Sequence, residues 1–169
     1  MLLERYFADA AKRMLHDSFD VNARDEEGRT ALHWAAWHGN TDMALALLDH
    51  GADVEAKDNY GMKPLHHAAV RGKTATAIAL IKRGADVNSC DKEGRAALHR
   101  AAWRGNMDTA IALVQYGANL SAADKGGLTP LYWLGPSGHS DMSRKLREAV
   151  SLRHARRVKA IRRAVLRLG

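Results

Sequence analysis

The chain repeats itself every 33 residues, and this period restricts its possible folds more than any other feature. Aspartate, glycine and leucine recur at fixed offsets in four copies without an insertion. The series are Asp25, Asp58, Asp91 and Asp124; Gly28, Gly61, Gly94 and Gly127; Leu32, Leu65, Leu98 and Leu131; and Gly39, Gly72, Gly105 and Gly138. A period of roughly 20 to 50 residues indicates a solenoid or a related array. We therefore expect a one-dimensional stack of similar units.

Each copy is predicted to form a helix, a turn, a second helix and an extended finger. In the first full copy, residues 30–39 (Thr-Ala-Leu-His-Trp-Ala-Ala-Trp-His-Gly) favour a short helix whose alanines allow a neighbour to approach closely. Gly39 can adopt the left-handed conformation that ends a helix. Asn40 or Thr41 can cap the second helix, which ends at Gly51. Neither helix can bury its apolar face alone, so adjacent units must share one core.

The residues conserved between the copies indicate a particular kind of repeat more specifically than the 33-residue period does. They are residues 30–33 (Thr-Ala-Leu-His), 62–66 (Met-Lys-Pro-Leu-His), 95–99 (Arg-Ala-Ala-Leu-His) and 128–132 (Leu-Thr-Pro-Leu-Tyr), with 51–54 (Gly-Ala-Asp-Val), 84–88 (Gly-Ala-Asp-Val-Asn) and 117–120 (Gly-Ala-Asn-Leu). Over roughly residues 18–140 the sequence resembles the ankyrin repeat family. The resemblance implies an all-α solenoid of stacked helix-turn-helix units with β-turn or hairpin fingers.

About three full repeats are expected, with atypical capping units and a basic C-terminal helix. The predicted segments are an N-terminal capping helix and finger at 1–24, ankyrin repeats at 25–57, 58–90 and 91–123, a degenerate repeat at 124–150, and a basic helical extension at 151–169. Residues 2–16 are predicted to form the capping helix. Pro136 falls where the fourth first helix should finish, so that helix should be short.

The C-terminal segment is predicted to be one long helix, because residues 141–168 contain no helix breaker. Apolar residues at Leu146, Val150, Val158, Ile161, Val165 and Leu168 give it a single stripe. Residues 141–169 hold 10 Lys or Arg and 2 Asp or Glu, a charge of +8, so the rest of the chain carries −1 of the net +7. The basic tail residues are Arg153, Arg156, Arg157, Lys159, Arg162, Arg163 and Arg167. Such a helix can bind nucleic-acid phosphates, an anionic membrane surface or an acidic protein, or it can simply cap the last repeat.

The sequence gives no support for a metal, a cofactor, a small-molecule substrate or catalysis. His33, His66 and His99 recur at the repeat period, and the resemblance implies buried histidines that hydrogen-bond the backbone within and between units. No Gly-rich phosphate loop or catalytic constellation is present. With one cysteine, Cys90, no secretory signal and no apolar run of membrane-spanning length, we expect a cytoplasmic or nuclear protein.

Function should lie in the positions that differ between copies. The resemblance implies that fingertips and the outward sides of the first helices line a concave groove. The partner-binding candidates are Arg29, Trp37, His38, Tyr60, Met62, Val70, Arg71, Arg95, Trp103, Arg104 and Leu128. Trp37, Val70 and Trp103 should form a row beside a second row of His38, Arg71 and Arg104. The alternative is that the two tryptophans pack at the edge of the core. Trp34 and Trp133 are expected to be core residues.

Two functions from different classes remain. The first is a protein-protein interaction module, acting as scaffold, adaptor or stoichiometric inhibitor, that holds a protein partner in the groove. The alternative is an anionic-surface binder whose basic C-terminal helix contacts nucleic acid or membrane, with the repeats as carrier. Salt dependence would separate them.

Overall fold

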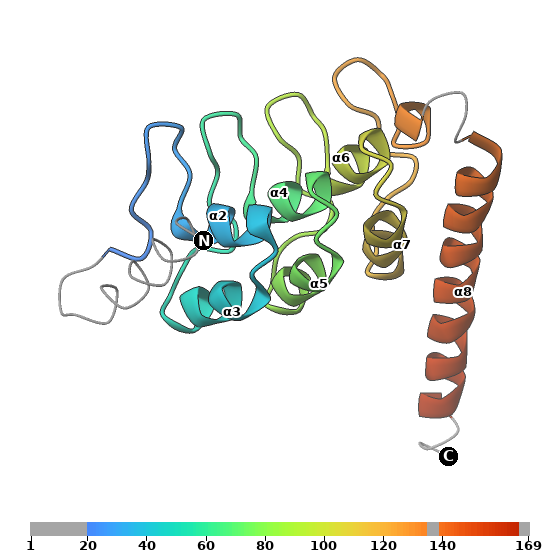
Figure 1. The fold of residues 1–169 in the computed structure, drawn as a ribbon. Coiled ribbons are helices and arrows are strands. Elements are labelled where there is room, and N and C mark those ends of the chain that lie inside the picture. The colour runs from blue at the N-terminus through green and yellow to red at the C-terminus, as the bar shows by residue number, and fades with distance from the viewer. Residues whose placement is uncertain (1–19, 135–138, 166–169) are drawn as a thin grey trace.

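The computed structural model describes residues 20–134 and 139–165, and within them three helix pairs stack side by side (Figure 1). The pairs are α2 (Ala31–His38) with α3 (Thr41–Asp49), α4 (Pro64–Val70) with α5 (Thr74–Lys82), and α6 (Ala97–Trp103) with α7 (Met107–Gln115). Helices α2, α4 and α6 form one row, and the fingers that precede them project in a common direction (Figure 1). The predicted all-α solenoid is confirmed. The capping helix predicted at residues 2–16 lies outside the described residues.

The repeated apolar residues form one continuous core through all three helix pairs. The leucine of each first helix is buried, as are the paired alanines beside it and the leucine of each second helix. These residues are Leu32, Leu65 and Leu98; Ala35, Ala36, Ala68, Ala69, Ala101 and Ala102; and Leu47, Leu80 and Leu113. Small alanines on the first helices allow close packing of α2 on α4 and of α4 on α6. Each unit therefore depends on its neighbours for its core.

A ladder of buried histidines ties each unit to the next. The Nδ1 atoms of His33, His66 and His99 accept the backbone N–H three residues earlier, at 3.0, 3.2 and 3.1 Å. Their Nε2 atoms donate to a carbonyl in the following finger, at 3.1, 3.0 and 3.2 Å. Since Nδ1 accepts and Nε2 donates, each ring is neutral. Burial lowers the pKa of both His33 and His66 to about 4. The expected structural role of these histidines is confirmed.

Adjacent fingers are also bonded backbone to backbone. Asn59 N donates to Glu27 O at 2.9 Å, Lys92 N to Tyr60 O at 3.1 Å, and Lys125 N to Glu93 O at 3.0 Å. Gly61 has φ +74° at one of these contacts, and an added Cβ would lie 2.9 Å from Lys92 N. The fingers are therefore held in register, and side chains at equivalent positions line up along the stack.

The C-terminal end departs from the repeat, as the sequence predicts. The fourth first helix is reduced to the 3₁₀ turn η1 (Tyr132–Leu134). Helix α8 (His139–Val165) lies alongside α7 in Figure 1 and runs without a break across the boundary predicted between residues 150 and 151. It buries Leu146 and Ala149 against the last repeat. In the described part of the chain, no helix is long and apolar enough to span a membrane.

Candidate functional site

The repeated aspartate closes the base of each finger. In the second finger, Asp58 Oδ1 accepts the backbone N–H groups of Tyr60 at 2.9 Å and Met62 at 2.8 Å. Asp25, Asp91 and Asp124 accept the equivalent pairs of N–H groups, two and four residues later, at 2.8 to 3.1 Å. One carboxylate oxygen thus fixes the shape of each finger, and the other oxygen remains available.

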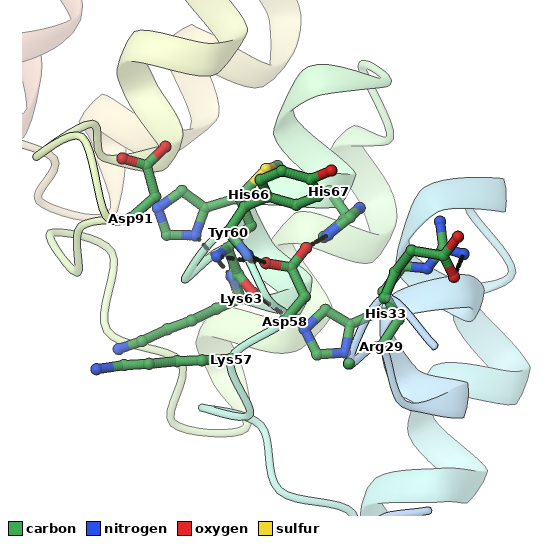
Figure 2. A network of polar contacts seen from close by, with 12 residues as sticks. Arg29, His33, Lys57, Asp58, Tyr60, Lys63, His66, His67 and Asp91 are labelled. Carbon is green, nitrogen blue, oxygen red and sulfur yellow. Dashed lines mark hydrogen bonds and ion pairs between the residues drawn. The ribbon is translucent and has the colours of Figure 1, made fainter. Parts of the chain in front are cut away.

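The second oxygen of each aspartate accepts a side-chain N–H nine residues later, on or beside the first helix. The four donors are Trp34 Nε1 to Asp25 at 3.0 Å, His67 Nε2 to Asp58 at 2.9 Å, Arg100 NH2 to Asp91 at 2.5 Å, and Trp133 Nε1 to Asp124 at 3.1 Å. Figure 2 shows the second of these pairs, with Asp58 between its own finger and His67. We call these four donors the plus-nine residues. They connect the finger to the helix with side chains that differ in each copy.

The plus-nine residues correct the sequence interpretation. Trp34 and Trp133 were expected in the core, but both are half-buried and each commits its indole N–H to a finger aspartate. His67 and Arg100 were missed as members of the same set. A constant separation of nine residues between an aspartate and an N–H donor was the signal that could have identified them.

Burial and hydrogen bonding set the charges of these pairs. The Asp58 and His67 side chains are 2% and 8% exposed, and burial lowers the pKa of His67 although its bond to Asp58 opposes this. Burial alone would raise the pKa of Asp91, but hydrogen bonds from the Arg95 backbone and the Arg100 guanidinium more than offset it and lower that pKa. A neutral His67 therefore donates to Asp58, whereas Arg100 forms an ion pair with Asp91.

The structure brings the predicted tryptophans and arginines together in stacked pairs. The Arg71 guanidinium lies 4.8 Å from the Trp37 ring centroid, and that of Arg104 lies 5.1 Å from the Trp103 ring. Trp103 is 51% exposed, whereas Trp37 is half-buried. The expected continuous row is wrong at its centre, because Val70 is only 7% exposed. Apolar contact area is therefore concentrated at the two tryptophans.

The remaining predicted residues lie on the fingers or, in the case of His38, at the end of α2. Arg29 pairs with Asp25 and Glu27 at 3.0 and 2.6 Å, and its guanidinium lies 4.2 Å from the Trp34 ring centroid. His38 is exposed and stacks on Trp34, and Tyr60 is 66% exposed. Met62, Arg95 and Leu128 are half-buried, and their carbonyls accept the histidine ladder. We call the surface formed by these fingers, the outward sides of α2, α4 and α6, and the plus-nine residues the finger-helix face.

Two equivalent hollows open on the finger-helix face. The N-terminal hollow has a volume of about 110 Å³ and is lined by Arg29, His33, Trp34, Trp37 and His67. The C-terminal hollow has a volume of about 130 Å³ and is lined by Arg95, His99, Arg100, Trp103 and Trp133. The second set is the first shifted by 66 residues, two repeat lengths. All four tryptophans of the chain line these hollows, two in each.

The basic tail residues lie on α8 but differ in their surroundings. Arg153 NH1 donates to Val114 O at 3.2 Å and so caps the end of α7. Arg156, Arg157, Lys159 and Arg163 are exposed; for Arg162 only the helical backbone is described, and Arg167 lies outside the described residues. The apolar stripe does not cover the last repeat along its whole length, because Val158 is 56% exposed. The stripe is buried at Leu146 and open to solvent at Val158.

Among the residues that the structure describes, no group of three or more His, Cys, Asp or Glu could hold a metal ion. The Cys90 thiol is exposed, and partial burial together with nearby Asp91 raises its pKa. It is therefore less nucleophilic than an ordinary cysteine at neutral pH.

Comparison with known proteins agrees with the repeat found in the sequence and the structure. A family model described as ankyrin repeats (three copies) matches residues 3–91 and, in an overlapping second match, residues 65–154. No curated protein matches the chain in a sequence comparison. The two matches together cover most of the 169 residues.

Proposed function

The chain belongs to the ankyrin repeat family, and from that premise we propose that it holds a protein partner against its finger-helix face. Ankyrin repeats generally mediate protein-protein interaction and are typically not enzymes. We propose that this chain likewise binds a protein and is not an enzyme, and that it acts as a scaffold, an adaptor or a stoichiometric inhibitor. None of these roles requires chemistry, only complementarity between two surfaces.

One observation carries the proposal: all four tryptophans of the chain line the finger-helix face, and none belongs to the core. Tryptophan and arginine are the residues most enriched at the energetic centres of protein interfaces. Three arginines stack on these rings, which fixes each guanidinium in place and lowers the entropy lost when it binds. A large, rigid and partly exposed aromatic surface is therefore ready before a partner arrives.

Partner capture by the full-length chain tests this proposal. The immobilised protein captures partners from an extract of its host, and the double variant Trp103→Ala with Arg104→Ala is compared with wild type. The matched control is Tyr116→Ala with Arg83→Ala, an exposed aromatic and an exposed arginine at the ends of second helices α7 and α5. We expect the double variant to lose the partner and the control to keep it. Capture that survives the first pair and fails with the second would refute the assignment.

A second candidate function rests on a different observation. From residue 154 onward every described side chain of α8 is exposed, and residues 151–165 carry six Lys or Arg and no Asp or Glu. We propose that this projecting half of α8 contacts an anionic surface, either nucleic acid or an anionic membrane, while the repeats hold another protein. The net positive charge and the exposed Val158 favour such a contact.

Deleting residues 154–169 tests the tail while keeping Arg153 in its contact with α7. Binding to double-stranded DNA, to anionic vesicles and to neutral vesicles is measured at low and at physiological salt. The proposal expects binding to DNA or to anionic vesicles that weakens steeply with salt and disappears on deletion. Equal binding by the shortened chain would contradict it. The partner captured by the finger-helix face should be retained in either case.

We also propose that the chain works in the cytoplasm or nucleus. Its single cysteine, Cys90, is exposed and has no second cysteine with which to form an intramolecular disulfide, as suits a reducing compartment. Fractionation of host cells with an antibody against the chain tests this, and recovery in a secreted fraction would contradict it.

A further inference from the structure

The two hollows are spaced for a ligand that fills both at once. They repeat at an interval of two units, and packed helices lie about 8 to 10 Å apart, which places the hollows about 16 to 20 Å from each other. An extended chain rises about 3.3 Å per residue and points alternate side chains to the same side. Two side chains six residues apart on an extended segment are therefore about 20 Å apart and face the same way.

Each hollow suits one side chain. The volumes of about 110 and 130 Å³ are well below the roughly 300 to 1,000 Å³ of clefts that hold drug-sized molecules. Two of the five residues that line each hollow are tryptophans, so a large apolar side chain is the expected guest. A cationic guest is disfavoured, because Arg29, Arg71 and Arg104 already lie over three of the rings.

The charge of the two hollows is unequal. At the N-terminal hollow, Arg29 is neutralised by two carboxylates, Asp25 and Glu27. At the C-terminal hollow, Arg95 and Arg100 share a single carboxylate, Asp91. Arg104 stands beside them, and within the described part of the chain it has no carboxylate partner. Arg71, which lies over Trp37, adds a second arginine at the N-terminal hollow, but the three carboxylates Asp25, Glu27 and Asp58 outnumber the two arginines there. At the C-terminal hollow three arginines outnumber the two carboxylates Asp91 and Asp124, so an excess of positive charge lies there.

We propose that the finger-helix face binds one extended acidic peptide segment, with a large apolar side chain in each hollow. The two anchoring side chains are six residues apart, and the carboxylates of the segment lie over the C-terminal hollow beside Arg104. This inference rests on the proposed function, and it adds the chemistry, spacing and orientation of the bound segment. Charge complementarity with the arginines selects an acidic partner over a basic one.

The four tryptophans supply a direct test, because each hollow is lined by two of them and every indole gives its own N–H signal. The full-length chain, labelled with ¹⁵N in its tryptophans, is titrated with a synthetic 12-residue peptide carrying leucine at its third and ninth positions and glutamate at the last three. Single Trp→Phe variants assign the four indole signals. A second peptide of identical composition has its leucines three positions apart, a separation too short to reach both hollows.

We expect all four indole signals to move with one common Kd for the first peptide. The second peptide should bind at least about tenfold more weakly, because it loses the advantage of a second linked contact. Arg104→Glu should weaken the first peptide more than Arg71→Glu does, and Trp103→Ala should remove the spacing preference. Equal affinities for the two peptides, movement of one pair of signals only, or no movement at millimolar peptide would each overturn the proposal.

A nitroxide on the acidic end of the first peptide tests orientation. It should broaden the indole signals of Trp103 and Trp133 and spare those of Trp34 and Trp37; the reverse pattern would refute the argument from charge. Failure here is distinguishable from failure of the proposed function. A captured protein whose binding requires Trp103 and Arg104 would leave the interaction module intact even if neither peptide bound as expected.

Discussion

Acidification should unfold this protein through its histidine ladder. His33 and His66 each use Nδ1 as an acceptor and Nε2 as a donor, an arrangement that only the neutral ring can satisfy. Protonation would place an N–H against an N–H and leave a charge in the core between two units. The unfolded chain has no such restriction, so it takes up protons more readily than the folded chain.

The magnitude follows from the two pKa values. Burial lowers the pKa of each ring from 6.5 to about 4 in the folded protein. The contribution to stability is complete above pH 6.5 and is lost as the pH falls from 6.5 toward 4, since the unfolded state binds the extra proton in that range. Between pH 7 and pH 5 each histidine lowers the free energy of unfolding by about 2 kcal/mol, and the two together lower it by about 4 kcal/mol. Such a loss is a large part of a typical stability of about 5 to 15 kcal/mol.

Urea denaturation followed by circular dichroism at a series of pH values measures this loss. The variant His66→Gln should be less stable at pH 7 but should lose about 2 kcal/mol less on acidification to pH 5. His50→Gln is the matched control, because His50 is exposed and its Nδ1 donates to Ala46 O, four residues earlier, at 2.8 Å. A wild-type free energy of unfolding that stays within about 1 kcal/mol between pH 7 and pH 5, or rises, would refute the reasoning.

Three further outcomes follow from the structure. Gly61→Ala should destabilise the chain more than Gly84→Ala by about 1 kcal/mol or more in thermal melts, because both glycines have positive φ but only Gly61 would clash with Lys92 of the next finger. Asp58→Ala should cost about 2 to 4 kcal/mol in urea denaturation, and Asp58→Asn less, since asparagine keeps the oxygen that accepts the two finger N–H groups. Deleting residues 154–169 should change the unfolding free energy by less than about 0.5 kcal/mol, because the described side chains there are exposed.

The residues that repeat every 33 positions were sufficient to predict the scaffold. Leu32, Leu65 and Leu98 occupy the same buried site in successive units, so one period in the sequence fixes one contact in space. The ladder histidines could be predicted for the same reason. The shortened fourth helix and the long α8 also followed from local signals, a proline in the first case and an uninterrupted helical pattern in the second. All of these features can be predicted without knowing which side chain faces which neighbour.

The candidate site was harder to predict because it depends on pairs of residues with different chemistry in each unit. Val70 shares its register with Trp37 and Trp103, yet it is 7% exposed whereas Trp103 is 51% exposed. The stacking of Arg71 on Trp37 joins two neighbouring repeats through residues that are 34 positions apart in the sequence. Register alone gives the position of such side chains and leaves their rotamers, and therefore their exposure, undetermined.

The plus-nine residues show how this scaffold limits the variation of its own binding surface. Each must satisfy the second oxygen of a finger aspartate, and each also lines or borders a hollow on the finger-helix face. An aliphatic side chain would leave a carboxylate oxygen, buried in the case of Asp58 and Asp91, without its donor, a cost of about 1 to 3 kcal/mol. Tryptophan, histidine and arginine all supply the N–H while presenting different surfaces to a partner. The chain can therefore change its specificity at this position without weakening the finger, provided that the replacement is a long N–H donor.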